Sequence, residues 1–354
     1  MKNVDNRDCL VLYHANCTDG FASAYIAREA LDRKRHPNRS FPRKNPTVYK
    51  AVNYSNPPPF DLMKEGMNVY ILDFSYPEQD ILWMIAVKKV NVILLDHHVP
   101  TFKKLSNLIR MYDEADPMIT RNLYMRLDGN ESGAMLTYKH FFGDELDEGE
   151  DFDTMLYSTA LFVDDRDRWQ FEVEGTREFF QNLTSYPRNF EVWDKLHAEF
   201  RSGKEVLRDF INVEGVAQLR MFNNYIEQLL DKPLVVGEID GLTTAMVSCD
   251  VFFSSELGNR LCEKYDAAIL YAYDPKTEKY LLSLRSRGDN DVERIARKYF
   301  NGGGHKNSSG GNTTQHLFWS DSNGSNFILN KRIGYFRESA DSDRTRPGRA
   351  SDRA

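Results

Sequence analysis

The sequence predicts a two-domain α/β protein whose first domain contains a parallel sheet. The chain has 354 residues, which is more than one hydrophobic core usually needs. In its first part, short apolar runs alternate with segments of helical spacing, a pattern typical of βαβ units. After Pro233 the pattern changes to short β runs, so we expect the second domain to begin there.

Four apolar runs are predicted to form the strands of the first sheet. They are rich in Val, Ile and Leu with few polar interruptions, as expected for strands that are covered on both faces. The predicted strands are residues 9–13, 48–54, 68–72 and 90–95. The predicted helices of the same region are residues 21–34, 80–89, 134–142 and 153–163.

Changes in polarity along the chain predict where its domains begin and end. We expect a first domain at residues 1–175, a helical connector at 176–232, and a second domain at 233–330. The β runs of the second domain are residues 234–239, 242–248, 267–273 and 280–286. Residues 337–354 are charged and lack apolar anchors, so a disordered tail is expected there.

Composition excludes several classes of protein. The formal net charge is −7, with 46 Lys and Arg against 53 Asp and Glu, so a binder of long duplex DNA is not expected. The four cysteines form no CxxC pair, which favours a reducing compartment. The first residues lack an apolar signal segment, and no run approaches the length of a membrane span. We therefore expect a cytoplasmic protein without a membrane partner. The sequence does not decide between a monomer and a homodimer.

Three predicted strands each end in side chains that can bind a metal ion. His14 follows the first run, Asp73 the third, and the triplet Asp96-His97-His98 the fourth. Because the carboxyl ends of parallel strands meet at one edge of a sheet, we expect these groups to lie together. A single Asp or His at a strand end is more often a turn former or helix cap, but three such ends favour a metal site.

Asp19 lies in the turn before the first predicted helix, whose N-terminus offers N–H groups to a phosphate. A mixed set of carboxylates and imidazoles suits Mn²⁺, with Mg²⁺, Fe²⁺ or Co²⁺ less favoured. One or two such cations would activate water and stabilise the charge that develops when a phosphodiester is hydrolysed. Asp73 is our candidate for a carboxylate that bridges two cations.

A second group of residues suits an anion. Arg285 lies on a predicted strand and can bind a phosphate or carboxylate through two hydrogen bonds. After a predicted helix at residues 292–300 come Gly302-Gly303-Gly304, then His305. Three consecutive glycines let backbone N–H groups approach an anion closely, although glycines alone also form flexible loops.

These residues resemble the motifs of the DHH/DHHA1 phosphoesterase superfamily. The triplet Asp96-His97-His98 resembles the motif that names the family, and the remaining matches follow in the family's order. They are His14 to Phe21, Leu72-Asp73, Asp164 to Trp169, Ser283 to Ser286, and Gly302 to Gly310. Any one of these matches is weak, whereas the ordered set is specific.

The resemblance implies a Rossmann-like catalytic domain, a smaller α/β substrate-binding domain, and an active-site cleft between them that holds Mn²⁺. It implies five metal ligands, with Asp165 favoured over Asp164 because it begins the DRDRW form: His14, Asp19, Asp73, His97 and Asp165. Asp96 and His98 would act as catalytic groups beside the metal or in contact with the phosphate. The substrate's distal end would be bound by Arg285, Ser286, Gly303, Gly304 and His305.

One residue departs from the family pattern. Many relatives carry two aspartates in the first motif, and aligning Asp19 with the second places Cys17 at the first. A Cys17 thiolate, Asn16 or a water molecule could replace the missing ligand, although a hard Mn²⁺ site favours thiolate little. This leaves open whether one or two cations bind.

The expected function is a metal-dependent phosphodiesterase that hydrolyses short oligonucleotides, dinucleotides or related phosphonucleotides, with Mn²⁺ as its cofactor. One alternative is a hydrolase of inorganic polyphosphate or pyrophosphate. Another is a nucleotide-binding protein that does not catalyse a reaction because its metal site is degraded, for which Cys17 is the main argument.

Overall fold

A computed structural model describes residues 8–31, 47–54, 56–143, 154–314, 329–334 and 336. The chain forms two compact units, residues 1–222 and 223–354, and the boundary falls within helix α11 (Val216–Leu230). The tail predicted at residues 337–354 lies outside the described residues. None of the helices in the described ranges is long and apolar enough to cross a membrane.

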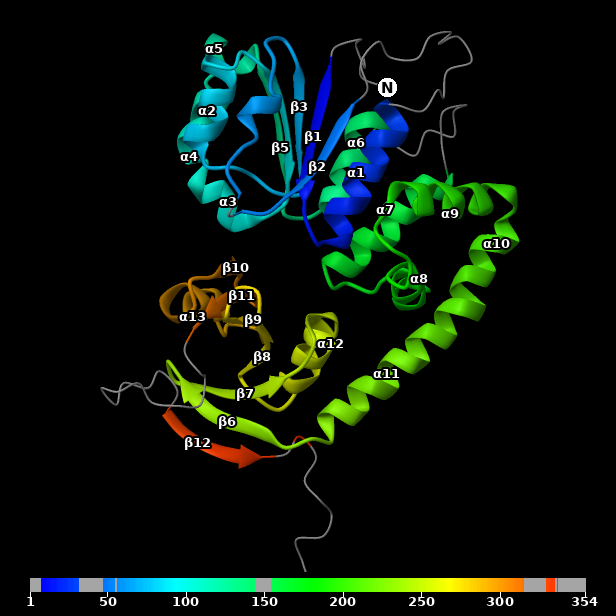
Figure 1. Ribbon diagram of the computed structural model, residues 1–354, viewed down its shortest axis with the longest axis vertical. Coiled ribbons are helices and arrows are strands. Elements are labelled where there is room, and N and C mark those ends of the chain that lie inside the picture. Colours follow the sequence, from blue (N-terminus) through cyan, green and yellow to red (C-terminus); the bar gives the residue numbers. More distant parts are fainter. Residues whose placement is uncertain are drawn as a thin grey trace, which may run out of the picture. The chain divides into compact units, whose positions relative to one another are not determined.

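The first unit is built on a five-stranded sheet in which all neighbouring strands are parallel (Figure 1). The strand order is β2-β1-β3-β4-β5. The strands are β1 (Cys9–His14), β2 (Val48–Val52), β3 (Asn68–Leu72), β4 (Asn91–Asp96) and β5 (Leu123–Leu127). Because they run in the same direction, their carboxyl ends meet at one edge, as the sequence predicted.

Helices cover both faces of this sheet. On one face, α1 (Thr18–Leu31) and α6 (Gly133–Phe142) pack Ala27 and Leu136 against Val11 and Leu95. On the other face, α2 (Glu78–Ala86) and α4 (Ser106–Asp113) pack against the sheet with Met84 and Leu108. Short helices precede and follow these elements: η1 (Phe60–Leu62), α3 (Val99–Lys104) and α5 (Pro117–Thr120). The near-continuous apolar runs of the strands reflect this double coverage.

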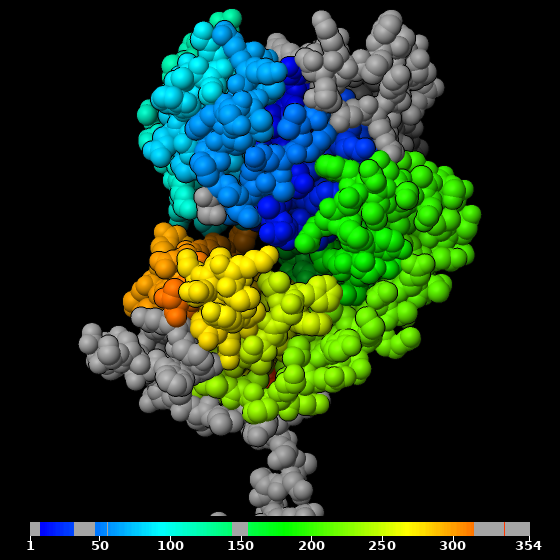
Figure 2. All heavy atoms as spheres, viewed as in Figure 1, coloured from blue at the N-terminus to red at the C-terminus, as the bar shows by residue number. Residues whose placement is uncertain are grey.

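A further group of helices packs against α1. It consists of α7 (Thr154–Asp167), α8 (Thr176–Leu183), α9 (Phe190–Ser202), α10 (Lys204–Asp209) and the π-helical η2 (Phe210–Gly215). Their core contains Trp193 and Phe179, which cluster with Phe21 and Tyr25 of α1. In Figure 2 the green atoms of these helices lie against the blue atoms of the N-terminal strand and helix. Residues 176–222 thus belong to the compact core of the first unit.

The second unit contains a seven-stranded mixed sheet of order β10-β11-β9-β8-β7-β6-β12. Its strands are β6 (Leu234–Ile239), β7 (Leu242–Ser248), β8 (Ala267–Asp274), β9 (Lys279–Ser286), β10 (Gly303–His305), β11 (Ser308–Thr313) and β12 (Leu329–Gly334). Only the β7–β8 pair is parallel among the pairs described. Helix α13 (Val292–Tyr299) packs Ile295 against Ile269 and Leu284 of the sheet. Helix α12 (Val251–Leu261) packs Gly258 against Leu270 and Arg285 of β8 and β9.

The predicted α/β class is therefore confirmed, with a parallel sheet in one unit and a mixed sheet in the other. Sequence analysis did not predict β5, α12, β11 or β12. It also treated the three glycines from Gly302 as a loop, whereas two of them begin the short strand β10. Since β10 pairs with β11 along Gly303 to His305, this segment is an edge strand.

Candidate metal centre

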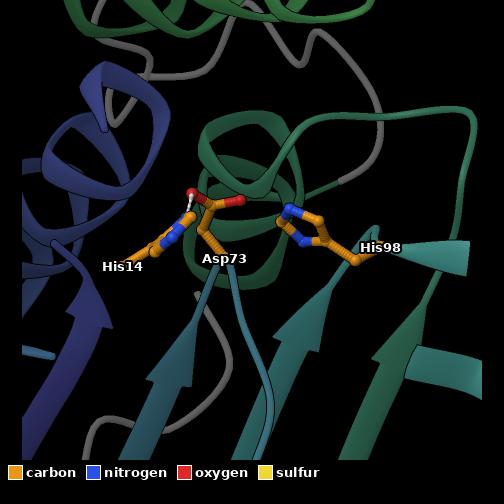
Figure 3. A group of neighbouring side chains, drawn as sticks. All are labelled: His14, Asp73 and His98. Carbon is orange, nitrogen blue, oxygen red and sulfur yellow. Dashed lines mark ion pairs between the residues drawn. The ribbon is translucent and has the colours of Figure 1, made fainter. Parts of the chain in front are cut away.

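The carboxyl edge of the first sheet brings the predicted ligands together. His14 ends β1, Asp73 follows β3 directly, and Asp96 ends β4 before His97 and His98. Figure 3 shows the rings of His14 and His98 pointing toward the carboxylate of Asp73 from either side. The Nδ1 atom of His14 lies 3.4 Å from Asp73 Oδ2.

The backbone at Asp73 turns its carboxylate into this edge. Asp73 has a φ of 63°, a left-handed conformation that Asp and Asn adopt more readily than other non-glycine residues. Its N–H donates to the carbonyl oxygen of Leu95 at 2.9 Å. A Cβ atom at Gly133 would lie 2.5 Å from the Asp73 Cβ, so glycine is required there for close approach of the two segments.

His97 lies at the centre of three carboxylates. Its Nε2 atom is 3.1 Å from Asp73 Oδ1, and 3.7 Å from both Asp19 Oδ2 and Asp167 Oδ2. Burial of the ring lowers its pKa, but the close contact with Asp73 and the charges of all three carboxylates outweigh burial and raise the pKa of His97 to about 10. One imidazolium charge against three carboxylates leaves negative charge in excess, which a divalent cation would neutralise.

Helix α6 fixes the position of Asp19. The N–H of Gly133 donates to Asp19 Oδ2 at 2.7 Å, and the N–H of Ala134 donates to Oδ1 at 2.8 Å. A carboxylate at a helix N-terminus satisfies N–H groups that have no partner within the helix. Burial and repulsion from Asp73 and Asp167 nevertheless raise the pKa of Asp19 well above its usual range. The N-terminus of α6 therefore orients Asp19 without removing the repulsion among the carboxylates.

Asp165, a predicted ligand, makes its described hydrogen bonds away from His97. Its carboxylate accepts hydrogen bonds from the N–H groups of Glu172 and Val173 and from the Thr176 hydroxyl, so it organises the turn after α7. The neighbouring candidate Asp164 accepts from the N–H of Ser132 at 2.6 Å and pairs with Arg168, the residue just after α7. Asp167 takes the place near His97 that Asp165 was expected to take. The same DRDRW motif contains both residues.

Asp96 orients His98. Asp96 is fully buried, and its Oδ1 atom accepts hydrogen bonds from the N–H groups of His97 and His98. The same oxygen lies 2.7 Å from His98 Nδ1, which places the ring proton on Nδ1 because the carboxylate can only accept. Burial lowers the pKa of His98, but the charge and hydrogen bond of Asp96 outweigh it and raise the pKa.

The buried polar atoms of this edge fit a divalent cation. Both carboxylate oxygens of Asp73 and the Nδ1 atom of His14 are buried without a hydrogen bond of good geometry among the described residues. Burial raises the pKa of Asp73, but its contacts with His14 and His97 outweigh burial and hold the pKa well below its usual range. Two groups have ligand atoms within 4.8 Å of one another, and both include Asp73: His14, Asp73 and His98; Asp19, Asp73 and His97.

Cys17 contributes no charge to this edge. Burial of its thiol, followed by the charges of Asp73, Asp167 and Asp19, raises the pKa of Cys17 well above its usual range. The thiol therefore stays protonated beside the carboxylates. Neither of the two groups of ligand atoms, as far as the chain is described, includes Cys17.

In the second unit, Arg285 lies under α12 and is bonded only to neutral oxygens. Its guanidinium donates to the carbonyl oxygen of Leu284 and to the hydroxyl of Ser255, both at 2.9 Å. No acidic side chain pairs with it among the residues that the structure describes. Burial lowers the pKa of Arg285 to about 10, so it is still a cation at neutral pH. A half-buried cation without an acidic partner is suited to an anionic ligand.

The other residues predicted to bind an anion differ in their hydrogen bonds and packing. The Ser286 hydroxyl donates to the carbonyl oxygen of Asn290 and accepts from the Asn307 amide, so it stabilises the surrounding turns. A Cβ atom at Gly304 would lie 2.7 Å from the Ser308 carbonyl oxygen, whereas one at Gly303 would meet only a distant side-chain oxygen at 3.9 Å. His305 follows them as the last residue of β10.

Tyr54 was not predicted as a site residue. Its ring centroid lies 5.3 Å from that of His14 and 6.0 Å from that of His98, and the residue is 53% exposed. The Tyr54 ring therefore covers part of the His14 and His98 rings. The chain has 18 tyrosines, and no signal in the sequence distinguished Tyr54 from the other 17.

Comparisons with known proteins place these features beside several relatives. No protein-family model matches the chain. It is 26% identical, over 315 residues, to an uncharacterized protein of Acanthamoeba polyphaga mimivirus, covering 87% of this chain and 68% of that one. The structure is similar to a pGpG-specific phosphodiesterase from Vibrio cholerae, with 12% identity, coverage of 86% and 93%, and a TM-score of 0.42. It is also similar to an exopolyphosphatase-related protein from Bacteroides fragilis, with 15% identity, coverage of 88% of each chain, and a TM-score of 0.37.

Proposed function

We propose that the chain is a metal-dependent phosphoesterase of the DHH/DHHA1 type that hydrolyses short oligonucleotides, dinucleotides or related phosphonucleotides. The observation that carries this proposal is the carboxylate of Asp73. It is buried, neither oxygen accepts a hydrogen bond of good geometry among the described residues, and it belongs to both groups of ligand atoms. Such a carboxylate is stable in the folded protein when a cation binds it.

The residues that would hold the cation are Asp73, Asp19, His97 and Asp167, with His14 on the opposite side of Asp73. Carboxylates and imidazole together suit Mn²⁺. When bound, a divalent cation supplies Lewis acidity, which neutralises phosphate oxygens and lowers the pKa of a nearby water molecule. Backbone hydrogen bonds orient the Asp19 carboxylate and hold the main chain at Asp73, and such bonds favour a preorganised site.

Arg285 is the residue that we propose to bind the anionic end of the substrate. Its charge has no acidic partner in the described part of the chain, and its two bonds to neutral oxygens fix the guanidinium plane. A planar guanidinium binds phosphate through two parallel hydrogen bonds. Binding of this kind selects substrates with a second phosphate or a terminal phosphate, as in short nucleotides.

A substrate panel tests this function. The purified full-length protein is stripped of metal, supplied with Mn²⁺, and incubated with pApA, a cyclic dinucleotide, a 3′-phosphoadenosine nucleotide and polyphosphate. We expect mononucleotide to be released from at least one nucleotide substrate, and EDTA to stop the release. Phosphate released from polyphosphate alone would replace the proposal with the polyphosphatase alternative. Nucleotide binding without turnover under any divalent cation would show a binding protein instead.

A further inference from the structure

Tyr54 places a partly exposed aromatic ring against the candidate metal centre. Its ring centroid lies 5.3 Å from that of His14, 6.0 Å from that of His98 and 6.3 Å from that of Phe74. The residue is nevertheless 53% exposed. A single exposed tyrosine needs no explanation by itself, but this one is in ring contact with two candidate metal ligands. Its open surface is therefore close to any group that is attached to a phosphate at the centre.

The three neighbouring rings fix the plane of the Tyr54 ring. They meet it at interplanar angles of 69° for His14, 82° for His98 and 85° for Phe74, which are all edge-to-face arrangements. Phe74 is fully buried and belongs to a hydrophobic core of the first unit. No ring in the described part of the chain stacks parallel on Tyr54. Its neighbours therefore hold the ring in one plane and leave parallel stacking to another group.

The turn that carries Tyr54 is fixed on both sides. The N–H of Asn53 donates to Asn56 Oδ1 at 2.8 Å, and the N–H of Asn56 donates to the carbonyl oxygen of Asn53 at 2.9 Å. Three prolines follow at residues 57–59, the last two of them buried, and each proline fixes its own φ. A side chain that is already positioned loses little conformational freedom when a ligand binds. This ring is therefore suited to recognition.

The surroundings of Tyr54 suit an uncharged planar group better than a further phosphate. Its two histidine neighbours are themselves close to the carboxylates of Asp73 and Asp96. Carboxylates repel an additional anion, whereas they do not repel a neutral nucleobase. Every nucleobase has a π face that stacks on an aromatic side chain. A nucleotide whose phosphate is bound at the centre carries such a base one sugar ring away.

We propose that Tyr54 is a specificity-determining residue whose ring stacks on the nucleobase next to the scissile phosphate. The inference rests on the proposed function in taking the carboxyl edge of the first sheet as the place of hydrolysis. It goes further by naming the residue that distinguishes nucleotides from inorganic polyphosphate, which has no base. Stacking of this kind tolerates any of the bases, because it depends on the π face and not on a pattern of hydrogen bonds.

Steady-state kinetics of Tyr54 variants test the stacking. The full-length protein with Mn²⁺ is assayed on the best nucleotide substrate of the panel. Tyr54→Leu, which keeps an apolar side chain without a π face, should lower kcat/KM about 10- to 100-fold, because one base–aromatic stack contributes that much affinity. Tyr54→Phe keeps the ring and should retain most of the wild-type value. Tyr273→Leu is the matched control, since Tyr273 is 54% exposed on β8, and it should leave kcat/KM unchanged.

Analogues that lack one base separate stacking from a structural role of Tyr54. In each analogue, one base of the substrate is replaced by hydrogen. On the analogue without the stacked base, the wild type should be as slow as Tyr54→Leu is on the complete substrate. Tyr54→Leu should lose nothing further on that analogue. If Tyr54→Leu instead slows the hydrolysis of every analogue by the same factor, the side chain acts through the structure of the centre and the proposal is overturned.

Fluorescence gives a readout that does not depend on turnover. A dinucleotide with 2-aminopurine bases and a methylene group in place of the scissile bridging oxygen binds without being hydrolysed. At saturating protein, its fluorescence should be quenched by the wild type and by Tyr54→Phe, and much less by Tyr54→Leu. Equal quenching by all three proteins would contradict stacking on Tyr54. The metal content of each variant, counted by mass spectrometry, should equal that of the wild type.

The outcomes distinguish this inference from the proposed function. If the wild type hydrolyses the nucleotide and Tyr54→Leu is equally active, stacking is refuted and the proposed function stands. If Tyr54→Phe loses as much activity as Tyr54→Leu, the hydroxyl and not the ring is required, which also refutes stacking. If the wild type hydrolyses no nucleotide of the panel, the proposed function itself fails, and the role of Tyr54 in that reaction fails with it.

Discussion

The candidate sites of the two units carry opposite charges that their own residues do not balance. In the first unit, three carboxylates surround the ring of His97. In the second unit, the Arg285 guanidinium is bonded only to neutral oxygens. Each site therefore needs an ion of the opposite sign that the described side chains do not supply.

This difference predicts that the two units bind different ions. A divalent cation would complete the first site, and a phosphate would complete the second. This division predicts that variants of the candidate ligands in the first unit change metal binding and turnover, whereas variants around Arg285 change substrate affinity.

The largest effect is expected for Asp73→Asn, which keeps the shape of the side chain and removes the charge common to both groups. We expect turnover to fall on the order of 10³-fold, as for loss of a central electrostatic group in a catalytic site. The rise in unfolding temperature on adding Mn²⁺ should also disappear. Asp113→Asn, on the exposed end of α4, is the matched control and should retain both. Full turnover in Asp73→Asn would contradict the shared role of Asp73.

Arg285→Ala should raise KM about 10- to 100-fold with little change in kcat, because a charged hydrogen bond contributes about 1.5–3 kcal/mol. Arg287→Ala is the matched control, since Arg287 is more exposed and bonds the Asn259 carbonyl oxygen instead. Steady-state kinetics on the best substrate of the panel measure both. A collapse of kcat with unchanged KM would move Arg285 into the chemistry and end the division of roles.

Asp167 and Asp165 give a smaller and more selective effect. Asp167→Asn should weaken Mn²⁺ binding about 10-fold, because it removes one of three carboxylates near His97. Asp165→Asn should leave Mn²⁺ affinity closer to that of the wild type and lower the unfolding temperature, because its carboxylate accepts three hydrogen bonds from the following turn. Calorimetric titration and thermal unfolding compare them. If Asp165→Asn lost more Mn²⁺ affinity than Asp167→Asn, the result would support the motif-based prediction that Asp165 is the metal ligand.

The glycines of the second unit give the smallest effect on chemistry. A Cβ atom at Gly302 would overlap the carbonyl oxygen of Gly310, so Gly302→Ala should cost about 1–3 kcal/mol of unfolding free energy. Gly303→Ala has room for its methyl group and should cost less than about 0.5 kcal/mol. Urea unfolding measures the difference. Equal costs would mean that the close approach of Gly302 to β11 does not explain the glycine there.

The parallel sheet could be predicted because its signal is local. Val69 to Leu72 is an unbroken apolar run, and the structure has β3 at Asn68–Leu72. Strand β5 was missed because it is an edge strand, partly exposed and interrupted by Arg126. Strand β11 was missed because its residues are polar or glycine, and its pairing with β9 joins segments that are distant in sequence. Pairing of that kind has no local pattern.

The clustering of side chains at the strand ends was predictable, but the position of Asp167 beside His97 was not. The edge that collects His14, Asp73 and His97 follows from strand direction alone. The choice between Asp165 and Asp167 does not, because residues two apart at the end of a helix point about 200° apart around its axis. Which of them faces the sheet depends on how α7 packs, and that is set by contacts with α1 and α6 rather than by the motif.

The two N–H groups at the start of α6 give the metal centre a signal that NMR can observe directly. The amide protons of Gly133 and Ala134 are bound by the oxygens of Asp19, so a change in the charge on that carboxylate will shift their NMR resonances and slow or speed their exchange with solvent. These two amides can therefore report cation binding in solution, at two backbone positions, even for an ion without colour or unpaired electrons.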